Sequence, residues 1–146
     1  MPLTLNNIQV DERLLNLMER PEWTTKHSSN KWLNKFLTHP SAKQKIPFVQ
    51  FCSIDNLISE NQGIEKLTKD QRNLFSGRPS ENYKPGDIDL SKSYLIGFTD
   101  YCDAGIFVDL RSQEGPKIVY DNLNNNGMIY ATAFNSVDEF IDFYNS

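Results

Sequence analysis

Tyr94-Leu95-Ile96-Gly97-Phe98 is the first of three short apolar runs that decide the fold, and Gly105-Ile106-Phe107-Val108-Asp109-Leu110 and Pro116-Lys117-Ile118-Val119-Tyr120-Asp121 follow it. Apolar side chains at every second position are typical of a β-strand with one face against a core. A fourth candidate strand runs from Met128 to Phe134. We expect consecutive strands whose core-facing side chains are Tyr94, Ile96, Phe98, Ile106, Val108, Leu110, Ile118 and Tyr120.

The links between these strands are short. Residues 99–104 and 111–115 can each close a hairpin, whereas parallel neighbours need a crossover of about a dozen residues or more. Residues 122–127 contain Asn124-Asn125-Asn126-Gly127, and both residue types adopt positive φ at low cost. The sequence therefore predicts an antiparallel sheet.

A helix is expected after the last strand. Ser136-x-x-Glu139 is a capping box, and the residues that follow have a helical period. The apolar side chains of one helical face are Val137, Phe140, Ile141 and Tyr144. We expect a C-terminal helix over residues 136–145 that packs on the sheet and closes it.

The first 45 residues have the pattern of helices. Asp11 can cap a short helix that ends before Pro21. A second helix, with Ser29 or Asn30 at its start, ends before Pro40. Its apolar stripe consists of Trp32, Leu33, Phe36 and Leu37, which we interpret as core residues.

The sheet core is expected over residues 46–134, approximately. Residues 46–52 are typical of a short edge strand, because Pro47 stands near its start. Ser53 can cap a helix that Gly63 ends, and Thr68-x-x-Gln71 can open a further short helix. Together with the strands above, these elements predict a single α+β domain over residues 1–146, with an antiparallel sheet packed against helices.

Residues 76–92 contain Gly77, Pro79, Pro85 and Gly86, which break any periodicity. We expect a long loop here. A structureless loop of this length inside a compact domain is uncommon, and such loops often carry function. A contact surface and a tolerated insertion remain equally good interpretations.

Charge is unevenly divided along the chain. The formal net charge is −4, but residues up to Pro79 carry a net charge of +3, whereas residues from Ser80 onward carry −7. The acidic excess therefore belongs to the strand-rich half. Such an excess favours a cationic partner.

Cys52 and Cys102 are the only cysteines, and their spacing predicts neither a disulfide framework nor a zinc site. We therefore expect a cytoplasmic protein without a cofactor. No segment approaches the roughly 20 consecutive apolar residues of a membrane-spanning helix, and the first residues do not have the pattern of a signal peptide. We expect no membrane partner.

The order of these motifs resembles that of the SUKH superfamily, the Smi/Knr-type domain. The resemblance rests on Leu95-Ile96-Gly97, on residues 105–110 and 115–120, and on Ala133-Phe134-Asn135-Ser136-Val137-Asp138-Glu139-Phe140-Ile141. It covers residues 93–144, with weaker support from residues 48–61, and the first forty residues depart from the family's pattern.

The resemblance implies an immunity protein that binds and neutralises a cognate bacterial toxin, possibly a nuclease. Some members of the superfamily are regulatory or scaffold modules, which is the alternative for this chain. The motif residues themselves are of the kind that supports a fold, so no partner-binding residue follows from the resemblance.

Acids at the ends of the strands are the candidate contacts with a basic partner. A nuclease carries a positive cleft that binds phosphate groups. Carboxylates of an inhibitor are attracted to such a cleft and compete there with the nucleic-acid substrate. Tyrosine adds interface energy at low ordering cost. For any single acid, solvated charge is the simpler explanation, but for the group we expect contact through Tyr83, Asp87, Asp89, Asp100, Tyr101, Asp103 and Glu114.

Other chemistries have weaker support. His27 and His39 lack metal-ligand or Cys-His spacing, and Cys102 stands among acids that disfavour its thiolate. Two histidines and two cysteines do not make a set of nucleophile, base and oxyanion donors, so we do not expect an enzyme. Lysines near Trp23 and Trp32 could contact nucleic acid, but the pI of about 5.1 opposes direct nucleic-acid binding.

Overall fold

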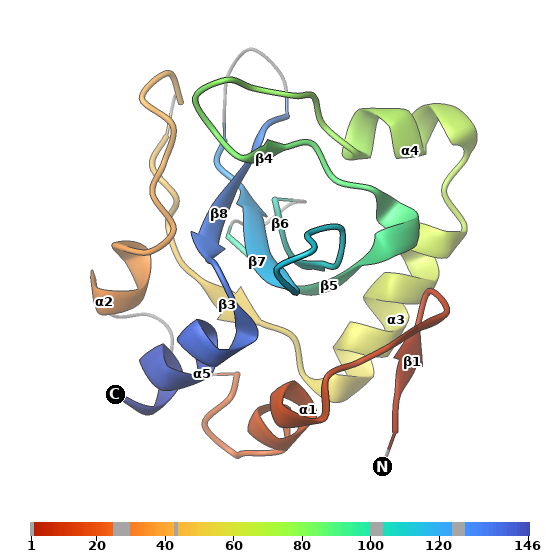
Figure 1. Cartoon of the computed structure of the whole chain (residues 1–146), viewed down its shortest axis with the longest axis vertical. Helices are drawn as coiled ribbons and strands as arrows, with labels where there is room; N and C mark the ends of the chain where they lie inside the picture. The colour runs from red at the N-terminus through yellow and green to blue at the C-terminus, as the bar shows by residue number, and fades with distance from the viewer. Residues whose placement is uncertain (1, 25–29, 43, 100–103, 124–127) are drawn as a thin grey trace.

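The computed structural model describes residues 2–24, 30–42, 44–99, 104–123 and 128–146. Within these residues an antiparallel sheet runs in the order β3-β5-β6-β7-β8-β4, and β1 and β2 form a separate hairpin (Figure 1). The α+β prediction is confirmed. The strands are β1 (Thr4–Leu5), β2 (Ile8–Gln9), β3 (Gln50–Phe51), β4 (Pro85–Gly86), β5 (Ser93–Phe98), β6 (Gly105–Asp109), β7 (Lys117–Asp121) and β8 (Tyr130–Phe134).

The helices begin where their capping residues predict. Asp11, Ser53 and Thr68 each accept a hydrogen bond from a backbone N–H of the first turn, and Thr68 and Gln71 form a complete capping box. The helices are α1 (Glu12–Met18), α2 (Asn30–Leu33), α3 (Ile54–Glu65), α4 (Lys69–Phe75) and α5 (Val137–Asn145), with a 3₁₀ turn at Leu90–Lys92. None of the described helices combines the length and hydropathy that crossing a membrane requires.

The ends of two predicted helices differ from the structure. Gly63 does not end α3, because the helix continues to Glu65 and is capped at Lys66 with φ −88°. The extra turn buries Ile64, which gives it a packing reason to form. Of the second helix, which was predicted to end before Pro40, only Asn30–Leu33 is α-helical among the described residues.

At the start of α5, only one of the two hydrogen bonds of the predicted capping box is formed. The Ser136 hydroxyl accepts the Glu139 N–H at 3.0 Å, as predicted. The Glu139 carboxylate accepts from the N–H of Asn135 at 3.2 Å, one residue before the position that a capping box uses. Both bonds still satisfy backbone donors at the start of the helix.

The prediction of one buried sheet face is wrong, because both faces are covered. Tyr94, Ile106, Val108 and Ile118 lie on one face, and Leu95, Phe107 and Val119 lie on the other; all are at most 1% exposed. Continuous apolar runs are typical of strands that are buried on both faces. Leu110 lies beyond β6 and is exposed.

A bulge at Ile96 also changes the predicted alternation. Leu95 pairs with Phe107, and Gly97 pairs with Ile106, so β5 holds one residue more than β6 at this point. Phe98 therefore pairs with Gly105 and shares the face of Leu95, not that of Tyr94.

Aromatic side chains cover the first face. Trp32 contacts the rings of Phe51, Phe134 and Phe140, and Trp23 contacts Phe51 in turn. On the second face, Phe75 of α4 makes an edge contact with Phe107 at a centroid distance of 5.9 Å. α4 and α5 thus close different sides of one sheet.

Residues 76–92 are not a long structureless loop. Pro85 and Gly86 pair with Ala131 and Tyr130 of β8, and Gly77 bridges to Asp87. Gly86 has φ +79°, and a Cβ there would lie 2.6 Å from the Ser80 nitrogen, so the close approach requires glycine. The segment adds the edge strand β4 to the sheet.

Basic side chains of the first half surround α5. Arg13 forms an ion pair with Asp138 near the start of the helix, and Lys35 lies 4.0 Å from Glu139. At the other end, Lys31 donates to the Phe143 carbonyl at 3.2 Å. Acidic side chains near the N-terminus of a helix and basic side chains near its C-terminus stabilise it. Part of the charge asymmetry of the sequence therefore serves contacts inside the molecule.

Candidate functional site

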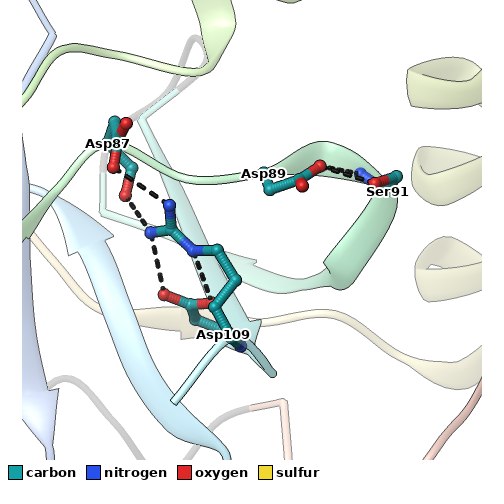
Figure 2. A network of polar contacts seen from close by, with 5 residues as sticks. Asp87, Asp89, Ser91 and Asp109 are labelled. Carbon is teal, nitrogen blue, oxygen red and sulfur yellow. Dashed lines mark hydrogen bonds and ion pairs between the residues drawn. The ribbon is translucent and has the colours of Figure 1, made fainter.

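Arg111 holds two of the acids that lie near the ends of strands. Its Nε and Nη2 donate to the two carboxylate oxygens of Asp109, both at 3.1 Å. Nη1 donates to Oδ1 of Asp87 at 3.0 Å, and Nη2 also donates to the Asp87 carbonyl. Figure 2 shows that Asp87 and Asp109 are turned toward this shared contact, whereas Asp89 lies apart from it.

Burial and the neighbouring carboxylates shift the pKa of Arg111 in opposite directions. Burial lowers the pKa of its guanidinium, but the hydrogen bonds that it donates to the two carboxylates, together with their charge, outweigh burial and raise that pKa above its ordinary value. The Asp109 side chain is 8% exposed, and that of Asp87 is 38% exposed. The site is therefore a clip in which one cation binds two carboxylates, one of them 24 residues away in sequence, and not a bare acidic surface.

Asp89 serves the local backbone. Its carboxylate accepts from the N–H of Ser91 at 2.9 Å and from the Ser91 hydroxyl at 2.6 Å. The hydroxyl bond is the main reason why the pKa of Asp89 lies below its ordinary value. This contact caps the 3₁₀ turn, and the side chain points away from Asp87 and Asp109 (Figure 2).

The remaining predicted residues have different partners or lie outside the described ranges. Tyr83 places its ring 5.0 Å from the His39 ring. Glu114 is 83% exposed and lies 3.7 Å from the Lys117 ammonium. Three predicted residues lie outside the part of the chain that the structure describes: Asp100, Tyr101 and Asp103.

A hollow of about 330 Å³ lies beside the Arg111 clip. It has three cations and two acids in its lining, so neither sign of charge dominates. Its lining consists of Lys84, Pro85, Asp87, Asp109, Arg111, Ser112, Lys117, Val119 and Thr132. Of the predicted contact residues that the structure describes, only Asp87 lines it. Sequence reasoning missed Asp109 and Arg111, although the spacing Asp-x-Arg could have indicated a local pair.

Two further hollows adjoin one another beside α3, and the sequence did not indicate them. They measure about 450 Å³ and about 180 Å³, and both are lined by Glu60 and Phe98. We call them the outer and the inner hollow. The outer hollow is completed by Thr24, Gln50, Phe51, Cys52, Ser53 and Asn56, and the inner one by Gly63, Ile64, Leu67, Phe75 and Leu95.

Phe98 lines both hollows because of the bulge at Ile96. The extra residue turns Phe98 to the face of Leu95, where it stays partly exposed. Helix α3 carries three exposed acids and no Lys or Arg. Within the described residues, Glu60 is the one charged side chain that lines either hollow, and no ion pair is formed by it.

Cys52 and His39 are of the residue types that can act as nucleophiles or metal ligands, but both make local contacts here. Burial raises the pKa of the Cys52 thiol to about 12, and the negative charge of Glu60 adds to that rise. His39 accepts the N–H of Ser41 at its Nδ1, at 3.0 Å. Over the described ranges no three His, Cys, Asp or Glu side chains are grouped for a metal ion.

No family model matches the chain, and comparisons with curated proteins and with solved structures give no match either. The resemblance to the SUKH superfamily therefore stays a prediction.

Proposed function

We propose that the chain works by binding another protein, and that it is an immunity protein which neutralises a cognate toxin by contact in the cytoplasm. The observation that carries the proposal is the surface beside α3. Exposed carboxylates there stand next to hollows with partly exposed aromatic side chains, Phe75 and Phe98. Aromatic side chains at a concave surface are typical of protein interfaces.

The internal contacts of α5 support the same proposal. Arg13 and Lys35 pair with acids of α5, and Lys31 donates to carbonyl oxygens at its C-terminal end, so all three cations are used inside the molecule. Acids of α3 have no such neighbours among the described ion pairs. A basic partner would be attracted to that side, and the attraction would weaken with salt.

The clip of Arg111 limits the role of the predicted acids. Asp87 is paired with Arg111 and Asp89 caps a turn, so both carboxylates already have partners within the chain. Asp100 and Asp103 retain their predicted role as contacts. Charge reversal at both positions should weaken partner binding, and unchanged affinity would exclude them from the interface.

The test is capture of the partner with the immobilised chain in an extract of the organism that makes it. We expect one retained protein with a basic domain, and we expect its toxic activity, assayed for a nuclease as cleavage of plasmid DNA, to disappear on mixing with an equal amount of the chain. Full activity of the captured protein in that mixture would refute neutralisation. A partner without toxic activity would favour the regulatory or scaffold role.

A further inference from the structure

We infer that the paired hollows beside α3 form one docking groove for a partner segment that carries a large apolar side chain next to a Lys or Arg. This inference deepens the proposed function, on which it rests, by naming the surface and the chemistry of the partner. The apolar side chain enters the inner hollow. The cation pairs with Glu60, which lies at the junction of the two hollows.

The inner hollow has the size and lining for one apolar side chain. Its volume is about 180 Å³, and a cavity of about 150 Å³ with a similar apolar lining accepts a benzene-sized group. Ile64, Leu67 and Leu95 contribute aliphatic surface, and Phe75 and Phe98 contribute aromatic surface. Removal of a leucine-sized group from water into such a site favours binding.

Helix α3 gives the groove a continuous wall. Asn56, Glu60, Gly63 and Leu67 recur at spacings of three and four residues, so they form one stripe of the helix and its C-terminal extension. Asn56 lies at the outer hollow and Leu67 at the inner one. The stripe therefore runs along both hollows and makes them parts of one groove.

Charge complementarity selects a cationic segment. Glu60 is exposed, and the described lining of the groove contains no Lys, Arg or His. Asp55 of the same helix adds negative potential, whereas at the C-terminal end Glu65 is followed by Lys66 and Arg72 donates to the Ile64 carbonyl. A phosphate or an acidic peptide would be repelled here, whereas a Lys or Arg gains an ion pair. The hollow beside Arg111 lacks this preference, because its acids are already paired with a cation of the chain.

Gly63 offers a way to close the groove without disturbing the fold. A Cβ built at Gly63 meets no atom within 4 Å, and its φ is not positive. A larger side chain there enters the inner hollow from the α3 wall. Gly63→Met should therefore block the docking site and leave the helix intact, since Met has a higher helix propensity than Gly. Gln62→Met adds the same side chain at an exposed neighbouring position outside the lining.

The probe is the peptide N-acetyl-Leu-Arg-Leu-amide, titrated into the ¹⁵N-labelled full chain, with N-acetyl-Leu-Gln-Leu-amide as the uncharged counterpart. We expect saturable amide shifts that centre on Gly63, Leu67 and Phe98. An exposed ion pair makes binding of the Arg peptide about two- to fivefold tighter than that of the Gln peptide. Glu60→Gln should remove this difference and Glu65→Gln should retain it, while Gly63→Met, but not Gln62→Met, should abolish the shifts.

Equal binding of the two peptides, shifts that centre on Arg111 and Lys117, or no shifts at all would overturn the inference. Partner capture separates it from the proposed function. If Gly63→Met and Glu60→Lys retain the partner as well as the unmodified chain does, the groove is not the interface, although the chain still binds a protein. If the peptides bind as expected and no partner is captured, the proposed function fails and the groove's selectivity stands.

Discussion

The side chain of Asn61 closes a pair of hydrogen bonds with the backbone of Leu95. Its Nδ2 donates to the Leu95 carbonyl and its Oδ1 accepts the Leu95 N–H, both at 2.9 Å. Strand β3 is only two residues long and pairs with Phe98 and Gly97, so it does not reach Leu95. The amide of Asn61 thus takes the place of a neighbouring strand, and it joins α3 to the sheet.

Replacing Asn61 with Ala should destabilise the fold. The change leaves the N–H and C=O of Leu95, a residue 1% exposed, without their partners. We expect the free energy of unfolding in urea to fall by about 2–4 kcal/mol, since each unsatisfied buried polar group costs about 1–3 kcal/mol. The exposed neighbour provides the control: Gln62→Ala should change stability by less than about 0.5 kcal/mol. Equal effects of the two substitutions would contradict this role.

Gly63→Ala should stabilise the protein. Gly63 lies inside α3 with helical geometry, and the added methyl group meets no atom within 4 Å. Alanine restricts the unfolded chain more than glycine does, so we expect a gain of about 0.5–1 kcal/mol in the free energy of unfolding. Thermal and urea unfolding both measure it. A loss of stability would mean that this position needs the conformational freedom of glycine.

Local features of the fold could be predicted from the sequence, because they depend on residues close together in the chain. The caps at Asp11, Ser53 and Thr68 involve partners two or three residues away. The central strands were recognised for the same reason. The end of α3 was missed, because burial of Ile64 by distant elements, and not the glycine before it, decides where the helix stops.

The candidate sites depend on contacts that sequence patterns do not contain. The bulge at Ile96 arises in the pairing with β6, and it turns Phe98 to the face that lines the groove beside Glu60. The pairing of Arg111 with Asp87 spans 24 residues. The acids predicted as partner contacts therefore stay a prediction, because the positions of the cations that pair with them do not follow from the sequence.

Asp11 should make the stability depend on pH in the acid range. Burial raises its pKa, but the hydrogen bonds and charge of Arg13 outweigh burial, so the pKa in the folded state lies below the ordinary 3.8. A lowered pKa means that the contribution is present above 3.8 and is lost as pH falls through the folded-state value. Asp11→Asn can keep the cap but removes the charge. The two proteins should differ in unfolding free energy at neutral pH and converge at low pH; a constant difference would contradict the assignment.

The thiol of Cys52 should be unreactive in the folded protein. Its pKa is raised to about 12 by burial and by the charge of Glu60, and the side chain is buried. In a Cys102→Ser background, which leaves Cys52 as the sole thiol, reaction with a disulfide reagent at about pH 8 should be at least a hundredfold slower than in the urea-unfolded chain, since the thiolate is the reacting species. Similar rates in the two states would show that the outer hollow exposes the sulfur.

Arg111 should stabilise the fold mainly through Asp109. The Asp109 side chain is 8% exposed, so Arg111→Met leaves a buried carboxylate without its cation, and we expect a loss of about 1–3 kcal/mol in the free energy of unfolding. Asp87→Asn should cost less than about 1 kcal/mol, because that carboxylate is 38% exposed. Lys117→Met is the control, since its partner Glu114 is 83% exposed and the pair should contribute less than about 0.5 kcal/mol. Urea unfolding of the three variants ranks their losses in the free energy of unfolding. If Asp87→Asn were as costly as Arg111→Met, the clip would depend on the bond to Asp87 and not on the pairing with Asp109.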